Sequence, residues 1–186
     1  MANNLQQAYE LTLVVRSQIG DDAAFAELLR LYSPRLRFYV GKMLHERHEN
    51  TEDLLQEIWV GVFRALPKLN DAAAFRAWLF RIARDRVCRE FRQARIEFHP
   101  LEDQQIENIL ADAEPDDAVD REAVRQQIAL LSPEHREALV LRFIEDMSYD
   151  EIARVTGNTL GTVRSRIHYA KRALRRAMKE EYYELK

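Results

Sequence analysis

Residues 131–178 read LSPEHREALVLRFIEDMSYDEIARVTGNTLGTVRSRIHYAKRALRRAM, and this stretch decides the fold. Ser132-Pro133 predicts a helix start, because Ser offers an N-cap oxygen and Pro needs no N–H at the first helical position. Ser148, with Glu151 three residues later, forms a capping box that predicts a second helix. Gly157-Asn158 favours the positive φ that ends a helix sharply. The first of these helices is expected to bury an apolar face made of Leu139, Val140, Phe143 and Ile144.

A third helix follows, and Thr159 is its expected N-cap. Apolar residues at spacings of three and four predict its inward stripe: Val163, Ile167, Ala170, Leu174 and Met178. Residues 161–179 contain seven Lys/Arg and no Asp/Glu. A charge run of mixed sign is usually a solvated face, but here one sign is wholly absent. The three helices therefore predict a helix-turn-helix domain whose third helix binds DNA.

The composition indicates an all-helical protein of one domain or two small ones. The chain has 186 residues, 47% of them hydrophobic, with only five Gly and five Pro. A net charge of −3 does not by itself suggest nucleic-acid binding. The charge is segregated along the chain, however, so the mean is misleading.

The cysteine and histidine residues favour neither a disulfide framework nor a metal site. The single cysteine, Cys88, fits a reducing compartment and is interpreted as a small buried residue on a helix. His45 and His48 lie near Glu49 in a polar connector, but nothing nearby completes a ligand set. We expect no metal, no cofactor and no catalytic residues. The N-terminus lacks a signal-peptide pattern or a membrane span, which predicts a cytoplasmic protein without membrane insertion.

The N-terminal half is predicted to consist of successive helices. The first two are expected over about residues 6–17 and 23–32, and Ser33-Pro34 is expected to begin another. Residues 52–66 form an amphipathic helix that Pro67 ends. A basic helix is predicted over 72–95, where residues 76–95 carry seven Arg against two acids. Arg interleaved with aromatic residues suits single-stranded nucleic acid, although simple core packing also explains Phe75 and Trp78.

Residues 97–122 carry ten Asp/Glu against one Arg and predict a flexible acidic linker. The expected domains are residues 1–96 and 120–186, with 97–119 as the linker. We hypothesise that the linker's acids lie over the basic faces in the free protein and suppress non-specific DNA binding.

Three motifs together resemble extracytoplasmic-function (ECF, group 4) sigma factors, the small initiation factors of bacterial RNA polymerase. They are Glu52-Asp53-Leu54-Leu55-Gln56-Glu57, the run from Phe75 to Arg84, and the run from Leu141 through Ser148-Tyr149-Asp150-Glu151 to Arg166. A lone helix-turn-helix would be weak, but the three in this order are specific. The resemblance implies sigma region two in the first domain and region four in the second.

The resemblance also implies partners and contact residues. The helix over 53–65 would dock on the clamp coiled coil of the polymerase beta-prime subunit through Asp53, Gln56, Glu57 and Val60. The following loop and helix would melt the promoter's minus-ten element and capture a flipped base with Lys68, Asn70, Ala73, Phe75, Trp78, Arg81 and Arg84. The third helix of region four would enter the major groove of the minus-thirty-five element, with contacts from Arg142, Thr162, Arg164, Ser165, Arg166, His168, Tyr169 and Arg172. A separate anti-sigma factor is implied by the family alone, as is a role in a stress response.

Two positions depart from the family pattern. The turn has Asn158-Thr159 where an apolar residue and Pro are usual, which alters how the third helix is capped. Asp85 stands where Asn is common and places an acid beside the predicted path of the DNA strand.

Two rival functions remain open at this point. A helix-turn-helix regulator that acts without polymerase would explain residues 131–178 but leave residues 53–95 without a purpose. A metal-dependent nuclease or recombinase would need clustered carboxylates or a nucleophile, which the sequence does not offer. No small-molecule substrate is expected.

Overall fold

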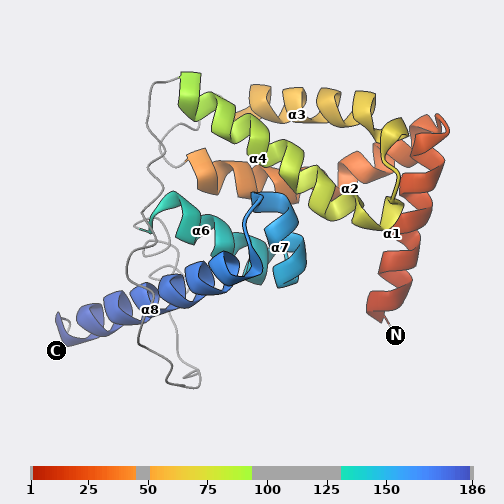
Figure 1. Ribbon diagram of the computed structural model, residues 1–186. Helices are drawn as coiled ribbons and strands as arrows, with labels where there is room; N and C mark the ends of the chain where they lie inside the picture. Colours follow the sequence, from red (N-terminus) through yellow and green to blue (C-terminus); the bar gives the residue numbers. More distant parts are fainter. Residues whose placement is uncertain (1, 45–50, 94–130, 185–186) are drawn as a thin grey trace. The chain divides into compact units, whose positions relative to one another are not determined.

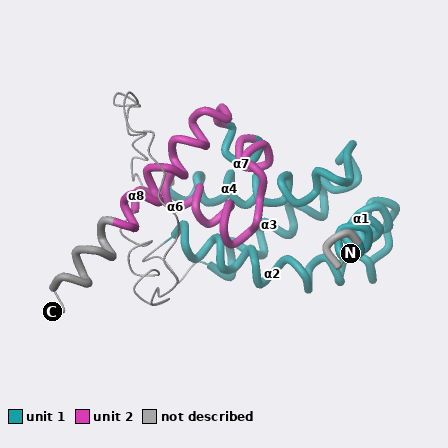
Figure 2. Tube along the Cα trace, turned by 90° about the horizontal axis from the view of Figure 1, so that it is seen from below, with its two compact units in different colours: residues 1–96, 154–157 teal, residues 97–153, 158–186 magenta. Residues whose placement is uncertain are grey.

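The computed structural model describes residues 2–44, 51–93 and 131–184, with side chains for 5–44, 51–92 and 131–175. These residues form helices and turns, and no strand occurs among them. The chain divides into two compact units (Figure 2): unit 1 contains residues 1–96 with 154–157, and unit 2 contains 97–153 with 158–186. The all-α prediction is confirmed. The predicted linker and the pair His45 and His48 lie outside the described residues.

Unit 1 is a helical bundle (Figure 1). Its helices are α1 (Ala2–Gln18), α2 (Asp22–Leu44), α3 (Thr51–Ala65) and α4 (Phe75–Gln93). Two single 3-10 turns, η2 (Leu66–Lys68) and η3 (Ala72–Ala74), connect α3 to α4. Helix α2 packs on the other three helices, and α1 also contacts both turns. Fully buried side chains fill the bundle centre: Leu28, Tyr32, Leu36, Tyr39, Ile58, Leu79 and Phe80.

The predicted break at Ser33-Pro34 is wrong, because α2 runs through Pro34 without interruption. Pro34 lacks the N–H that would bond to the carbonyl of Arg30, which costs about 3 kcal/mol inside a helix. The Pro34 side chain is exposed, so water can reach the freed carbonyl. The buried stripe continues in phase across this point, through Leu28, Tyr32, Leu36 and Tyr39. Packing on both sides of the proline therefore keeps one helix.

The helix-turn-helix elements belong to unit 2, except for residues 154–157 at the end of α7, which are grouped with unit 1. The elements are α6 (Pro133–Leu139), a single π-turn labelled η4 (Val140–Ile144), α7 (Tyr149–Thr156) and α8 (Leu160–Glu184). Helix α6 packs on α8. Leu131, Leu139 and Ala170 form a buried cluster against which Leu174 packs.

All three predicted helix starts in unit 2 are confirmed. Ser132 Oγ accepts a hydrogen bond from the His135 N–H at 3.4 Å. In the capping box, the Ser148 N–H donates to Glu151 Oε2 at 2.8 Å and the Glu151 N–H donates to Ser148 Oγ at 3.2 Å.

The buried face predicted for the first of these helices is only half right. Leu139 and Val140 are buried, but Phe143 and Ile144 are exposed. The Glu145 N–H donates to the Val140 carbonyl at 3.0 Å, five residues back. The extra residue in this turn rotates the following side chains by about 100°. Leu141 and Met147 are the residues that become fully buried.

Candidate nucleic-acid and polymerase interfaces

Helix α8 presents an exposed basic stripe opposite its buried side. Val163, Ile167 and Ala170 are buried, as predicted. The α8 basic stripe consists of exposed residues at spacings of three and four: Arg164, His168, Lys171, Arg172 and Arg175. Three residues predicted to contact the minus-thirty-five element therefore share one solvent-accessible face.

The turn before α8 caps this helix although it lacks the apolar residue and Pro of the family pattern. Gly157 has φ +69°, which ends α7. Thr159 Oγ1 accepts from the Thr162 N–H at 3.2 Å, and the two threonine hydroxyls lie 3.0 Å apart. Thr159 is therefore the N-cap, as predicted. Its hydroxyl caps the start of α8 at the turn where the usual pattern has a proline.

The remaining predicted contacts in α8 are half-buried: Thr162, Ser165, Arg166 and Tyr169. Ser165 Oγ donates to the Gly161 carbonyl at 3.0 Å, which leaves its lone pairs as acceptors. The Tyr169 ring lies edge-on to His168, with ring centroids 5.6 Å apart. The hydrogen bond therefore fixes the Ser165 hydroxyl, and the Tyr169 ring restricts the orientation of His168.

Arg142 binds within its own turn. Its Nη1 donates to the Met147 carbonyl at 2.9 Å and lies 3.7 Å from Asp146 Oδ1. Asp146 has φ +50°, a conformation that is unusual for a non-glycine residue. The guanidinium also lies 5.6 Å from the centre of the Tyr149 ring. Arg142 therefore holds together the connection from η4 to α7, and any DNA contact uses its remaining N–H groups.

In unit 1, the segment 66–74 connects α3 to α4, and we call it the α3–α4 loop. Its predicted contact residues, Lys68, Asn70 and Ala73, are all exposed. Asp71 caps η3, because Asp71 Oδ1 accepts from the Ala73 N–H at 2.9 Å. Short turns thus shape the loop and leave these residues accessible.

The two predicted aromatic contacts differ in exposure. Phe75 is 2% exposed and packs edge-on against Tyr32, with ring centroids 5.4 Å apart. Trp78 is half-buried and lies 6.0 Å from Phe75. Phe75 therefore forms a buried support against which Trp78 packs, and the Trp78 ring is the more solvent-accessible of the two.

Along α4, the predicted contacts continue with Arg81, which is exposed, and Arg84, which is half-buried. Asp85 and Arg89 are exposed as well, four and eight residues after Arg81. Cys88 was predicted to be buried on this helix, but it is only partly buried.

The outward face of α3 contains all four predicted polymerase contacts, Asp53, Gln56, Glu57 and Val60, and each is exposed. We call this set the α3 face. Glu57 Oε2 lies 3.3 Å from Arg86 Nη1 on α4. Glu57 is well exposed, so this ion pair contributes at most about 1 kcal/mol and a partner can displace it.

Phe63 extends the α3 face and was missed from the sequence. It follows Val60 by three residues, and 57% of it is exposed. Its ring packs edge-on against Phe25, with centroids 5.2 Å apart. The helical spacing from Val60 could have revealed it. Two exposed apolar side chains beside acids form a surface suited to a protein partner.

Neither a metal site nor a membrane span emerges from the described parts of the chain. No three His, Cys, Asp or Glu side chains gather there in a way that could hold an ion. None of the described helices combines the length and apolar character needed to cross a bilayer.

Comparisons with known proteins identify both units. The family model for sigma-70 region 2 matches residues 28–96, and that for sigma-70 region 4 matches residues 121–174. The RNA polymerase sigma-H factor of Pseudomonas aeruginosa is 33% identical over 94% of this chain and 96% of its own length. The ECF sigma factor SigW of Bacillus subtilis is 27% identical over 87% of this chain and 92% of its own length.

Among solved structures, the sigma factor RpoE of Bartonella quintana, in complex with the anti-sigma factor NepR, is 25% identical with a TM-score of 0.65. That match covers 83% of this chain and 96% of the other. The fold and these matches thus define a sigma factor of RNA polymerase. Within that class, the chain belongs to the extracytoplasmic-function sigma factors.

Proposed function

We propose that unit 1 binds core RNA polymerase and opens the minus-ten element, while α8 in unit 2 reads the minus-thirty-five element. One observation carries this proposal: unit 1 presents two chemically different exposed surfaces. The α3 face is acidic and apolar, whereas α4 is basic and the α3–α4 loop before it presents the exposed Lys68. A regulator that only read DNA would have no use for the first surface.

The α3 face suits the clamp coiled coil of the beta-prime subunit, as the family resemblance implies. Val60 and Phe63 supply apolar contacts, and Asp53 and Glu57 supply acceptors for basic side chains. Gln56 adds both a donor and an acceptor. Apolar anchors surrounded by polar groups are the usual anatomy of a protein interface.

The α3–α4 loop and α4 suit an opened minus-ten strand. Lys68 and Arg81 are exposed cations for phosphates, and Asn70 offers an amide for the edge of a base. Trp78, which packs on Phe75, provides a partly accessible ring, and Arg84 provides a further cation on the same helix. Ala73 is small and exposed, so it leaves room for an extruded base. Charge for the backbone and a ring for stacking are the requirements of single-strand binding.

In unit 2, we assign base contacts to Arg164, His168 and Arg172, which lie in the α8 basic stripe. Thr162, Ser165, Arg166 and Tyr169 take flanking base or phosphate contacts. Arg142 supports the DNA backbone from the preceding turn.

We further propose that an anti-sigma factor restrains this protein in the bacterial cytoplasm. The solved Bartonella quintana relative is itself bound to an anti-sigma factor. The identity of the corresponding partner is open.

A test separates the two interfaces in the full-length chain. Val60→Asp and Phe63→Asp should weaken binding to core polymerase at least tenfold, since each buries a charge in an apolar contact. Arg164→Ala should leave core binding unchanged and weaken binding of the holoenzyme to a minus-thirty-five site by about 1–3 kcal/mol. Ile19→Asp, at an exposed apolar position in the turn directly after α1, is the matched control.

Core binding is measured by fluorescence anisotropy and promoter binding by gel shift. If neither α3 variant affects core binding, while the free chain binds the promoter without polymerase, the polymerase-independent regulator is the better reading. If Arg164→Ala weakens every DNA sequence equally, Arg164 contacts phosphate and not a base.

A further inference from the structure

Gln18, the last residue of α1, forms hydrogen bonds to the α3–α4 loop, about fifty residues away in the sequence. Its Nε2 donates to the Leu69 carbonyl at 2.7 Å and to the Leu66 carbonyl at 3.2 Å. The Leu69 N–H also donates to the Leu66 carbonyl, at 3.1 Å. One side-chain amide thus uses both of its N–H groups to join the two ends of the first turn of the α3–α4 loop.

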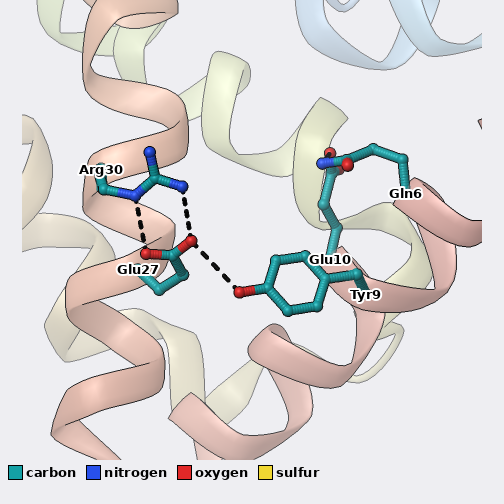
Figure 3. Close-up of polar contacts among 5 residues, drawn as sticks. All are labelled: Gln6, Tyr9, Glu10, Glu27 and Arg30. Atoms are coloured by element: carbon teal, nitrogen blue, oxygen red, sulfur yellow. Dashed lines mark hydrogen bonds and ion pairs between the residues drawn. The ribbon is translucent and has the colours of Figure 1, made fainter.

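Helix α1 is itself fixed to α2, as Figure 3 shows near its N-terminal half. The Tyr9 hydroxyl donates to Glu27 Oε1 at 3.3 Å, and Arg30 holds the same carboxylate with two hydrogen bonds of 2.8 Å. The buried Tyr32 hydroxyl donates to Glu10 Oε2 at 2.6 Å. Burial, aided by Glu10, raises the pKa of Tyr32, so this donor keeps its proton.

The C-terminal end of α1 is equally well defined. Arg16 forms an ion pair with Asp21, 2.6 Å apart, and Gly20 has φ +90° where the chain turns into α2. Asp21 in turn caps α2 by accepting from the Ala24 N–H at 3.0 Å. Gln18 therefore projects from a rigid support.

The α3–α4 loop needs such a support because its own contacts are short in range. Asp71 accepts hydrogen bonds from the N–H groups of Ala73 and Ala74, which lie two and three residues further along the chain. The groups proposed to meet DNA, on Lys68, Asn70 and Ala73, point to solvent. Helix α1 contacts both η2, which contains Lys68, and η3, which contains Ala73; Asn70 lies between the two turns.

We propose that Gln18 is a positioning residue for promoter opening: its amide holds the α3–α4 loop in the shape that receives the unpaired minus-ten strand. This inference rests on the proposed function of the loop. A loop that is already ordered loses less conformational entropy when the strand binds, so the opened state is favoured. Gln18 itself does not touch DNA.

The experiment uses holoenzyme assembled with the full-length chain on a promoter that carries 2-aminopurine in the minus-ten element. Gln18→Met keeps the length of the side chain but removes both donors. It should slow opening about tenfold, the scale of two lost hydrogen bonds, with core binding unchanged within twofold. Gln18→Lys restores donors to the same site and should recover opening to within about threefold of the parent chain.

The added charge of lysine is controlled by the double variant Gln18→Met with Ile19→Lys. Ile19 is 82% exposed, so its lysine adds the same charge without reaching the carbonyls. This double variant should open as slowly as Gln18→Met alone. Amide hydrogen exchange in the free chain gives a second readout: Gln18→Met should raise exchange in residues 66–74 but not in the middle of α4.

Three results would overturn the inference: normal opening by Gln18→Met, no recovery by Gln18→Lys, or recovery by the charge control. The proposed function of the loop is tested separately by Asn70→Ala and Lys68→Ala in the same assay. If those variants open normally, the loop is not the strand-capture element. If they fail to open while Gln18→Met opens normally, the loop assignment stands and the role of Gln18 is wrong.

Discussion

Asp85 lies on the exposed face of α4 between Arg81 and Arg89, at four-residue spacing from each. An acid at this position opposes the phosphates that the neighbouring arginines are proposed to bind. The electrostatic cost of this repulsion is small in water, but it falls on the contact that we propose opens the promoter. The sequence showed the substitution, and the structure shows that the carboxylate is exposed on the same face as the cations.

Asp85→Asn should tighten binding of the holoenzyme to fork-junction DNA with a single-stranded minus-ten element by roughly threefold. A charge about 7 Å from a phosphate contributes roughly 0.6 kcal/mol in water, and salt reduces this. Affinity is measured at two salt concentrations on DNA without a minus-thirty-five element. Asp150→Asn, an exposed acid in α7, removes the same charge and should have no effect on this DNA. Equal affinities for the parent chain and Asp85→Asn would place the strand away from this face.

At the scale of the element, local and tertiary causes of structure separate clearly. Ser132, Ser148 with Glu151, and Thr159 start their helices as predicted, because a cap needs only a side chain and backbone within three residues. The continuous α2 and the π-turn η4 were not predicted. Both depend on which side chains the rest of the unit buries.

Two glycine substitutions should have opposite effects on stability. Gly61 lies inside α3, and a methyl group there would sit at 3.7 Å from Arg86 Nη2, an ordinary contact. Gly61→Ala should stabilise the protein by up to about 1 kcal/mol through helix propensity. Gly157 has φ +69°, so Gly157→Ala should destabilise by about 1–2 kcal/mol.

Calorimetry of the two variants gives the sign through the midpoint temperatures. A lower midpoint for Gly61→Ala would mean that the methyl group disturbs the packing of α3 on α4. An unchanged midpoint for Gly157→Ala would mean that the turn can relax out of the left-handed region.

At the scale of the whole molecule, charge alternates along the chain: basic in residues 76–95, acidic in 97–122 and basic in 161–179. The acidic segment lies outside the described residues, so its role is argued from charge alone. Because its charge is opposite to that of the two basic segments, we expect it to compete with DNA phosphates for their arginines.

Neutralising the ten acids of residues 97–122 to Asn and Gln should therefore raise the affinity of the free chain for random duplex DNA. The expected gain is at least tenfold at low salt and shrinks as salt rises. The measurement is fluorescence anisotropy with a duplex that lacks promoter elements. Unchanged affinity at low salt would show that the linker does not shield the basic faces.

The sequence by itself determined the helical class, the three caps of unit 2, the inward and outward sides of α3 and α8, and the family. Each of these follows from periodicity, local hydrogen bonding or motif order, which are properties of neighbouring residues. Only the tertiary structure decided that α2 passes through Pro34 and that Phe75 is buried against Trp78. It also decided that Phe143 is exposed and not buried, and that Phe63 extends the α3 face. It alone brought Gln18 to the carbonyls of Leu66 and Leu69. The physical reason is that burial and long-range hydrogen bonds depend on which helices pack together, and no local pattern carries that information.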